Sequence, residues 1–288
     1  MFLDEFGKVY KDKDLYEYNT YKVHSIANYL IEVDNVVKLT KLIAFLNEKG
    51  YKYFVIGNGS NIILPSKYDG IVIKLSFYEI KYEKDIITVG ASYMLNKLAM
   101  ESINNGLTGL EWACGIPGTV GGSLYGNAGA YLDEIANYVE EAEVLENNRI
   151  KILKKNDIFF EYRSSSLQKR DLIILSVKLK LKKGSSEESL SLVNDRFQRR
   201  MATQPLDYPS AGSVFRNPEG MYAGKIIEDL GLKGKIIGGA MVSDKHANFI
   251  VNTGNATGED IYALIRFIKD KVKEEAGIDL ILEQKIVN

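Results

Sequence analysis

Two glycine-rich segments contain the residues best suited to bind a cofactor through the backbone. Residues 57–61 read Gly-Asn-Gly-Ser-Asn, and residues 115–129 contain six glycines and no charged side chain. Glycine lets backbone N–H groups approach a ligand closely, and successive N–H groups form nests that bind pyrophosphate or the edge of a flavin ring. We therefore expect one site for a large phosphate-bearing cofactor. Its predicted residues are Gly57, Asn58, Gly59, Ser60, Asn61, Gly115, Ile116, Pro117, Gly118, Thr119, Gly121, Gly122, Asn127, Ala128 and Gly129.

Other glycine-rich structures explain these segments less well. A single glycine pair such as that in residues 57–61 is more often a tight turn. A Rossmann loop needs a helix directly after the glycines, whereas this segment continues into Ile-Ile-Leu-Pro, which cannot start one. A Walker loop needs a Gly-Lys-Ser or Gly-Lys-Thr triplet, which the chain lacks. Two such segments in one chain favour a cofactor site outside these folds.

Composition limits the class of protein. The 288 residues carry a net charge of −1 without a long basic patch, so a nucleic-acid partner is not expected. Cys114 is the only cysteine and there are two histidines, so we expect no disulfide and no metal site. No signal peptide is recognised, and no apolar run approaches the roughly 20 residues that span a bilayer. The sequence predicts a cytoplasmic protein without membrane insertion.

The pattern of apolar residues predicts mixed helices and strands around the glycine segments. A helix at residues 35–49, capped by Asp34 and ended by Gly50, precedes a strand at 51–56 that delivers the first segment. A second helix at 92–105 precedes the other segment. Further strands are predicted at residues 62–64, 71–75, 79–82, 86–89 and 172–181, with a hairpin formed by 139–145 and 150–153 around Asn147 and Asn148.

The last third of the chain is predicted to be a separate domain. A helix reaches about Met201 and stops at Gln204 and Pro205. Helices follow at residues 224–230 and 257–275, the latter capped by Thr257, with strands at 248–251 and 280–287. The expected fold class is α+β, with domains at residues 1–84, 85–203 and 204–288.

Four further motifs give the chain a resemblance to a known family. They are Tyr-Arg-Ser-Ser-Ser at 162–166, Pro-Ser-Ala-Gly-Ser-Val-Phe-Arg-Asn-Pro at 209–218, Ala-Gly-Lys-Ile-Ile-Glu-Asp-Leu-Gly-Leu-Lys-Gly at 223–234 and His-Ala-Asn-Phe-Ile-Val-Asn at 246–252. Together with the glycine segments, they resemble the UDP-N-acetylenolpyruvoylglucosamine reductases in the same order. Residues 167–207 are too few for the extra tyrosine-bearing subdomain of one branch, so the chain resembles the branch that lacks it.

The resemblance implies a fold and a reaction. It implies an FAD-binding part of the vanillyl-alcohol-oxidase (PCMH) type in two subdomains, followed by a C-terminal α+β substrate-binding domain. FAD would be the cofactor and NADPH the co-substrate in reducing UDP-N-acetylenolpyruvoylglucosamine to UDP-N-acetylmuramate, a peptidoglycan precursor. The resemblance also suggests a monomer. Another FAD-dependent oxidase or dehydrogenase, or a non-catalytic module of the same fold, are the alternatives.

The resemblance also implies roles for individual residues. Ser213 matches the proton donor, Arg163 the arginine that supports the intermediate and Glu283 the carboxylate near the reacting carbon. Lys225 and Asn248 are expected to contact the nucleotide sugar.

Taken singly, each of the three reacting residues has a simpler interpretation. Ser213 could be a turn residue, Arg163 could pair with Glu161 at the surface, and Glu283 could be a solvated strand residue. The family commonly has valine and arginine where Gln284 and Lys285 stand, which leaves the register of Glu283 open, and glycine where Leu132 stands.

Overall fold

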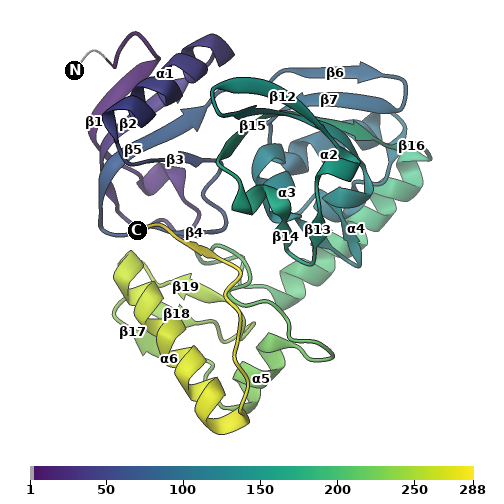
Figure 1. Cartoon of the computed structure of the whole chain (residues 1–288). Helices are drawn as coiled ribbons and strands as arrows, with labels where there is room; N and C mark the ends of the chain where they lie inside the picture. Colours follow the sequence, from purple (N-terminus) through teal and green to yellow (C-terminus); the bar gives the residue numbers. More distant parts are fainter. Residues whose placement is uncertain (1–2) are drawn as a thin grey trace. The chain divides into compact units, whose positions relative to one another are not determined.

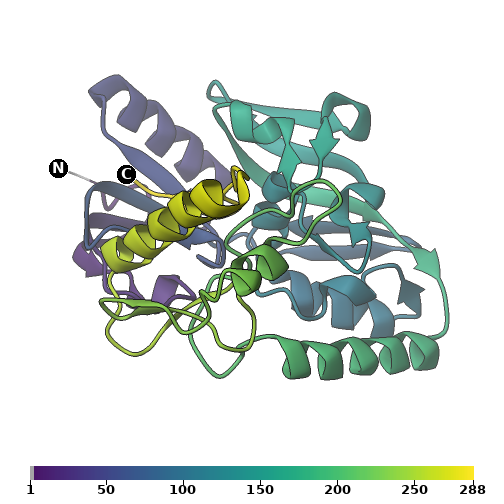
Figure 2. The same ribbon diagram turned by 90° about the horizontal axis from the view of Figure 1, so that it is seen from below.

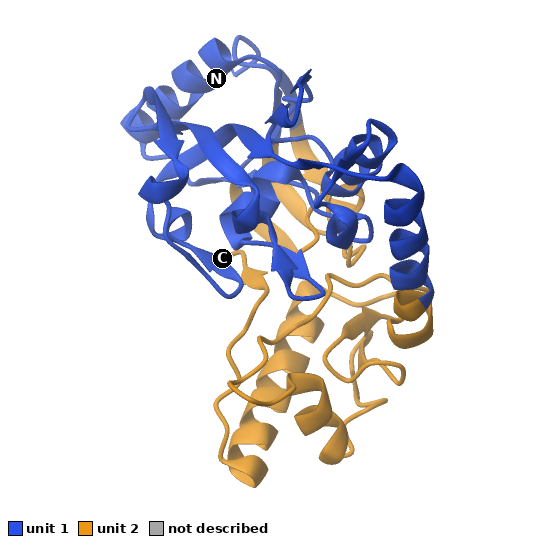
Figure 3. Cartoon of the chain, turned by 90° about the vertical axis from the view of Figure 1, so that its right-hand side faces the viewer, with its two compact units in different colours: residues 1–10, 30–58, 71–198 blue, residues 11–29, 59–70, 199–288 orange. Residues whose placement is uncertain are grey.

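The computed structural model describes residues 3–288, which form two compact units built from interleaved segments (Figure 3). Unit 1 comprises residues 1–10, 30–58 and 71–198, and unit 2 comprises residues 11–29, 59–70 and 199–288. The predicted domain limits at residues 84 and 203 do not coincide with these segments and stay a prediction.

Unit 1 contains a five-stranded antiparallel sheet with the order β12-β11-β15-β7-β6 (Figure 1). Its strands are β6 (Ile80–Glu83), β7 (Ile86–Gly90), β11 (Val139–Glu146), β12 (Arg149–Lys154) and β15 (Leu172–Lys180). The predicted hairpin is β11–β12, and it turns at Asn147 and Asn148, which have φ values of 52° and 57°. Asparagine tolerates this left-handed conformation, which a two-residue hairpin turn requires.

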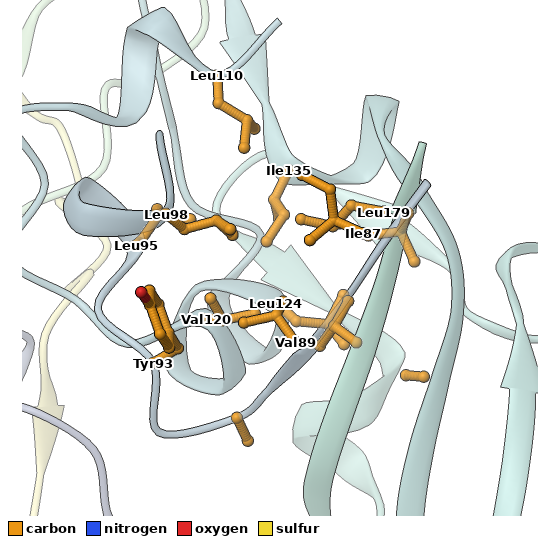
Figure 4. Close-up of a cluster of buried hydrophobic side chains, with 14 of the residues drawn as sticks. Ile87, Val89, Tyr93, Leu95, Leu98, Leu110, Val120, Leu124, Ile135 and Leu179 are labelled. Carbon is orange, nitrogen blue, oxygen red and sulfur yellow. The ribbon is translucent and has the colours of Figure 1, made fainter. Parts of the chain in front are cut away.

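Two helices pack on this sheet to form the core of unit 1. They are α2 (Leu95–Asn104) and α3 (Val120–Gly126). Figure 4 shows buried side chains of α2, α3 and β7 in one cluster, among them Leu95, Leu98, Val120, Leu124, Ile87 and Val89. Because burying one aliphatic side chain contributes about 1.5–3 kcal/mol, this packing fixes α3 firmly. The second glycine segment is thereby anchored to the core.

A four-stranded sheet with the order β1-β2-β5-β3 contains the strand that enters the first glycine segment. β3 (Tyr53–Ile56) pairs in parallel with β5 (Lys67–Leu75), and α1 (Val36–Lys49) precedes β3. The α1 cap is Asn35, whose side chain accepts from Val37 and Lys38, so the prediction of Asp34 was wrong by one residue. Gly50 ends α1 in a left-handed conformation, as expected.

Two strands near the N-terminus were not predicted. They are β1 (Lys8–Asp14) and β2 (Ile26–Val33). β1 has no buried residue, so its polar sequence gives no period-two pattern of apolar side chains. β2 carries adjacent buried residues, Leu30 and Ile31, instead of strict alternation.

Unit 2 is centred on the long helix α6 (Gly258–Ala276), which contacts a small antiparallel sheet. The sheet has the order β17-β18-β19, with β17 (Ile236–Ile237), β18 (Ala240–Val242) and β19 (Ile250–Asn252). Thr257 caps α6 as predicted, and the helix buries an apolar stripe that runs from Ile261 to Val272. The shorter helix α5 (Ala223–Asp229) also contacts α6.

The C-terminal strand is shorter than predicted. Only β20 (Lys285–Ile286) is regular, and it pairs in parallel with β4 (Ile62–Ile63). Leu282 forms an isolated bridge with Phe215. The remaining short strands are β8 (Leu107–Thr108), β9 (Gly129–Ala130), β10 (Asp133–Glu134), β13 (Phe160–Glu161), β14 (Ser164–Ser165) and β16 (Lys182–Lys183).

The helix α4 (Ser186–Thr203) is seen lengthwise in Figure 2. It extends two residues beyond the predicted end at Met201, and Ser189 is its only buried residue. None of the helices formed by residues 3–288 is both long and apolar enough to cross a membrane.

Candidate functional site

The two glycine segments meet within unit 1. The Asn58 side-chain amide donates to the Pro117 carbonyl over 2.6 Å. A Cβ atom on Gly57 would lie 2.9 Å from the Thr119 hydroxyl oxygen, so the Thr119 side chain leaves little room for a larger residue there. The start of the first segment therefore contacts residues 117–119 of the second, although the individual cofactor-binding residues stay predictions.

Part of the second segment is a helix, which the sequence interpretation missed. Thr119 caps α3 by accepting from the Gly122 N–H over 3.2 Å. The Val120 and Gly121 N–H groups donate to the carbonyls of Tyr93 and Ala91. A Cβ on Gly121 would lie 2.8 Å from the Ala91 side chain, so this glycine serves close packing. These three amides are committed to the protein and do not form a ligand nest.

The first segment retains backbone donors. Among the hydrogen bonds that residues 3–288 form with one another, none uses the N–H groups of residues 58–61. Gly59 is buried, and a buried N–H group without an acceptor is costly. Asn58 and Ser60 are half-buried and Asn61 is exposed, and four successive N–H groups without a protein acceptor suit a multiply charged anion such as pyrophosphate. The residues of the first segment thus suit a phosphate-bearing cofactor.

Two side chains beside the segments have perturbed acidity. The Lys74 ammonium donates to the Gly57 carbonyl, and burial lowers the pKa of Lys74 below its usual value. Burial raises the pKa of the Cys114 thiol to about 11, so it stays protonated and unreactive at neutral pH. The sequence did not predict Lys74 as a site residue, because only the pairing of β5 with β3 places it at this segment.

Arg163 lies in unit 1, in the turn between β13 and β14. Its φ of 55° is left-handed, which is uncommon for a residue other than glycine and is often kept at functional sites. Its guanidinium lies 5.1 Å from the centre of the Tyr162 ring. Asn127 supports the same turn, because its side-chain amide donates to the Glu161 carbonyl over 2.9 Å.

Ser213 and Glu283 come together in unit 2. The Glu283 N–H donates to the Val214 carbonyl over 2.8 Å, and the Asn61 side chain donates to the Glu283 carbonyl over 3.2 Å. Gln284 is 3% exposed and donates to the carbonyls of Ala211 and Gly212. The backbone is therefore held on both sides of Glu283, while its match to the family's carboxylate stays a prediction.

The two predicted substrate-binding residues differ in their surroundings. Lys225 is exposed and forms an ion pair with Asp229 over 2.5 Å, which raises the pKa of Lys225. Asn248 is 4% exposed, accepts from the Phe215 N–H over 3.0 Å and donates to the Phe215 carbonyl over 2.8 Å. Its amide is thus committed to the backbone that carries Ser213, while both substrate assignments stay predictions.

His246 supports the same region. Its Nδ1 accepts from the Asn248 N–H over 3.2 Å, and its ring lies 4.8 Å from that of Phe249. Burial lowers the pKa of His246, so the ring is neutral at physiological pH. These contacts give His246 a structural role beside Asn248.

Comparison with protein families defines the class first. Residues 27–149 match the FAD binding domain model, which includes the first glycine segment and all of the second. The chain is therefore a flavoprotein with an FAD-binding domain. Residues 204–287 match the model of the UDP-N-acetylenolpyruvoylglucosamine reductase C-terminal domain.

Full-length relatives identify the family. A UDP-N-acetylenolpyruvoylglucosamine reductase of Caldanaerobacter subterraneus subsp. tengcongensis is 44% identical over 98% of this chain and 94% of the relative. That of Caldicellulosiruptor saccharolyticus is 42% identical over 96% and 90%. The chain belongs to the UDP-N-acetylenolpyruvoylglucosamine reductase family.

A solved relative supports the fold. The crystal structure of the reductase from Thermus caldophilus superposes with a TM-score of 0.83 at 34% identity, covering 98% of each chain. The expected α+β fold class, an FAD-binding domain with a C-terminal reductase domain, is confirmed by these matches.

Proposed function

We propose that this chain reduces UDP-N-acetylenolpyruvoylglucosamine to UDP-N-acetylmuramate in peptidoglycan precursor synthesis, with FAD as cofactor and NADPH as hydride donor. The relatives that carry this name, at 44% and 42% identity, support the reaction. One observation supports the assignment of the reaction to particular residues. The backbone of residues 213–216 pairs with that of residues 281–283, which brings Ser213 and Glu283 close to one another along the chain pair.

FAD would be held by residues 57–61 and by parts of 115–129. The unbonded N–H groups of residues 58–61 suit its pyrophosphate. Bound FAD would serve as the hydride carrier between NADPH and the enolpyruvyl double bond. The protein must then supply a proton and stabilise negative charge on the substrate.

Three side chains would perform these steps. Ser213 would donate the proton, which a weakly acidic hydroxyl can do only to a strongly basic carbanion. The permanently charged guanidinium of Arg163 would stabilise the enolate-like charge. Glu283 would lie near the reacting carbon, and Lys225 and Asn248 would act on the nucleotide sugar.

The enzyme would act as a monomer in the cytoplasm. The match to reductases of this family supports the cytoplasmic location. Light scattering of the purified protein at several concentrations would measure its mass. A concentration-independent dimer would contradict the monomer.

A two-step assay tests the reaction. Under anaerobic conditions, NADPH should bleach the flavin absorbance, and adding UDP-N-acetylenolpyruvoylglucosamine should restore it. Ser213→Ala should leave the first step intact and slow the second by about 10²- to 10⁴-fold, the usual contribution of a positioned acid. Ser191→Ala, on the exposed part of α4, is the matched control.

Two outcomes would contradict the proposal. One is a colourless protein that cannot be reconstituted with FAD. The other is a flavin that an alcohol reduces without NADPH, since that would indicate an oxidase or dehydrogenase of another specificity. Equal rates for Ser213→Ala and wild type in the second step would remove Ser213 from the mechanism.

A further inference from the structure

Lys74 lies beside the start of the first glycine segment because of strand register. In the parallel pair β3–β5, Lys74 is the partner of Ile56, the residue that precedes Gly57. Its neighbours Ile73 and Leu75 are buried, so alternation along β5 sends the Lys74 side chain to the opposite face. There its ammonium donates to the Gly57 carbonyl.

Glu32 of the neighbouring strand β2 attracts the Lys74 ammonium, but burial outweighs this attraction and lowers the pKa of Lys74. An ammonium group has three N–H donors, and the Gly57 carbonyl uses one of them. Among residues 3–288, no carboxylate forms an ion pair with Lys74. Most of the lysines that form ion pairs are exposed, as Lys67 on the same strand is. Lys74, in contrast, is half-buried. A half-buried cation of this kind favours an anion as its partner.

The surrounding backbone is arranged for an anion as well. The Asn58 N–H follows Gly57 and has no acceptor among the described residues. The Asn58 side chain is held by the Pro117 carbonyl, which fixes the segment. A cation beside a fixed backbone donor binds phosphate oxygens through charge-assisted hydrogen bonds, which are about twice as strong as neutral ones.

We propose that Lys74 is a cofactor-binding residue whose ammonium pairs with the pyrophosphate of FAD while it holds the Gly57 carbonyl. The inference rests on the proposed FAD cofactor and adds a charged side chain to a site predicted from backbone groups alone. Under this proposal Lys74 acts on the cofactor through its charge, which differs from a role in which it only supports the loop.

The test compares FAD affinity in three variants. Apoprotein of wild type, Lys74→Met, Lys74→Arg and the exposed control Lys67→Met would be titrated with FAD, following the change in flavin fluorescence. A hydrogen bond to a charged group contributes about 1.5–3 kcal/mol, so Lys74→Met should bind FAD about 10- to 150-fold more weakly. Lys74→Arg, which keeps the positive charge, should lose less affinity than Lys74→Met, and Lys67→Met should stay within about threefold of wild type.

Salt dependence separates the charge from loop support. The titrations would be repeated at about 0.01 M and about 1 M NaCl, where the screening lengths are about 30 Å and about 3 Å. Wild-type affinity should fall with salt more steeply than that of Lys74→Met, because only wild type has the ammonium. A loop-supporting lysine would leave the salt dependence unchanged.

Each outcome has a definite meaning. Two results would overturn the role of Lys74. One is a Lys74→Met variant that binds FAD as tightly as wild type. The other is a loss of FAD affinity that is the same in Lys74→Met and Lys74→Arg and leaves the salt dependence unchanged. If Lys74→Met does not fold, as judged by its thermal transition, Lys74→Gln gives the same comparison. If wild-type apoprotein itself binds no FAD, the proposed cofactor fails, and that result differs from a defect confined to the variants.

Discussion

At the scale of single residues, Asn248 shows how a buried side chain can position the backbone beside Ser213, the predicted proton donor. Its amide spans the Phe215 N–H and carbonyl, and its own carbonyl accepts from the Val214 N–H over 2.9 Å. Ser213 precedes this clamped stretch and forms a bridge with Phe249. The position of Ser213 is therefore set by the backbone around Asn248.

Replacing Asn248 by alanine should destabilise the protein by about 2–6 kcal/mol, because two buried groups of Phe215 lose their partners at about 1–3 kcal/mol each. Urea unfolding followed by circular dichroism would measure the change. Asn255→Ala, at an exposed position in the same unit, is the control. An equal effect of both substitutions would show that the Phe215 contacts contribute nothing.

The sequence indicated the chemical type of these residues but not their partners. Asn248 stands in a motif that the resemblance links to substrate, yet its amide oxygen and one of its amide N–H groups bind the backbone of Phe215. Lys74 stands in an ordinary strand, and only its register with Ile56 makes it important. Register depends on long-range pairing, so neither result could be derived from spacing along one chain.

At the scale of elements, α3 shows why a glycine-rich sequence was taken for a loop. Its seven residues include three glycines, and each lowers helix propensity by about 1 kcal/mol relative to alanine. The helix forms because Val120 and Leu124 are buried in the core and Thr119 caps its start. Tertiary packing, which sequence periodicity does not contain, overrides local propensity here.

The cap of α6 was predictable, since Thr257 stands three residues before Asp260 in a capping box. Thr257→Ala should cost about 0.5–2 kcal/mol of stability, whereas Thr257→Ser, which keeps the hydroxyl, should cost clearly less. Thermal unfolding of both variants measures this. Equal losses in the two variants would assign the effect to the methyl group instead of the cap.

The hairpin β11–β12 is tied to the start of β15 by Glu146. Arg170 donates to both carboxylate oxygens over 2.7 and 2.9 Å, and Lys151 donates over 2.6 Å. These hydrogen bonds lower the pKa of Glu146 from 4.5 to about 2. Because the folded pKa is depressed, the stabilisation is complete above about pH 4.5 and is lost as the pH falls towards about 2.

Glu146→Gln should therefore be less stable than wild type by about 1–2 kcal/mol at neutral pH, which is the scale of hydrogen bonds to charged groups after allowance for solvent. The difference should shrink to less than about half by about pH 3. Urea unfolding at both pH values would measure it, with exposed Glu219→Gln as control. A difference independent of pH would exclude a contribution from the ionised pair.

At the scale of the whole molecule, the positions of the α-helices other than α3 were predicted well, whereas the assembly of segments was not. Long helices such as α1 and α6 contain a helical repeat of apolar residues and their own capping residues, so the local sequence predicts them. Unit 2, in contrast, is built from three stretches of chain, and its short strands β4 and β20 are more than 200 residues apart in sequence. Pairing over such separations leaves no local pattern.

Gln284 joins these stretches within unit 2. It accepts from the Tyr21 hydroxyl over 2.9 Å and donates to the Ala211 and Gly212 carbonyls, so it connects the first and last stretches of the unit. In Gln284→Ala these buried groups would lack partners, each at a cost of about 1–3 kcal/mol. The local opening free energy of unit 2 should fall while the core of unit 1 is unaffected.

Hydrogen exchange measures this directly. Amides near Tyr21 and in residues 213–216 should exchange about 10- to 100-fold faster in Gln284→Ala, which corresponds to about 1.4–2.8 kcal/mol. Amides of β7, β11 and β15 should keep their wild-type rates, as should all amides in the exposed control Gln198→Ala. Equal acceleration in both units would mean that they open together, and unchanged rates in unit 2 would mean that Gln284 does not hold its segments.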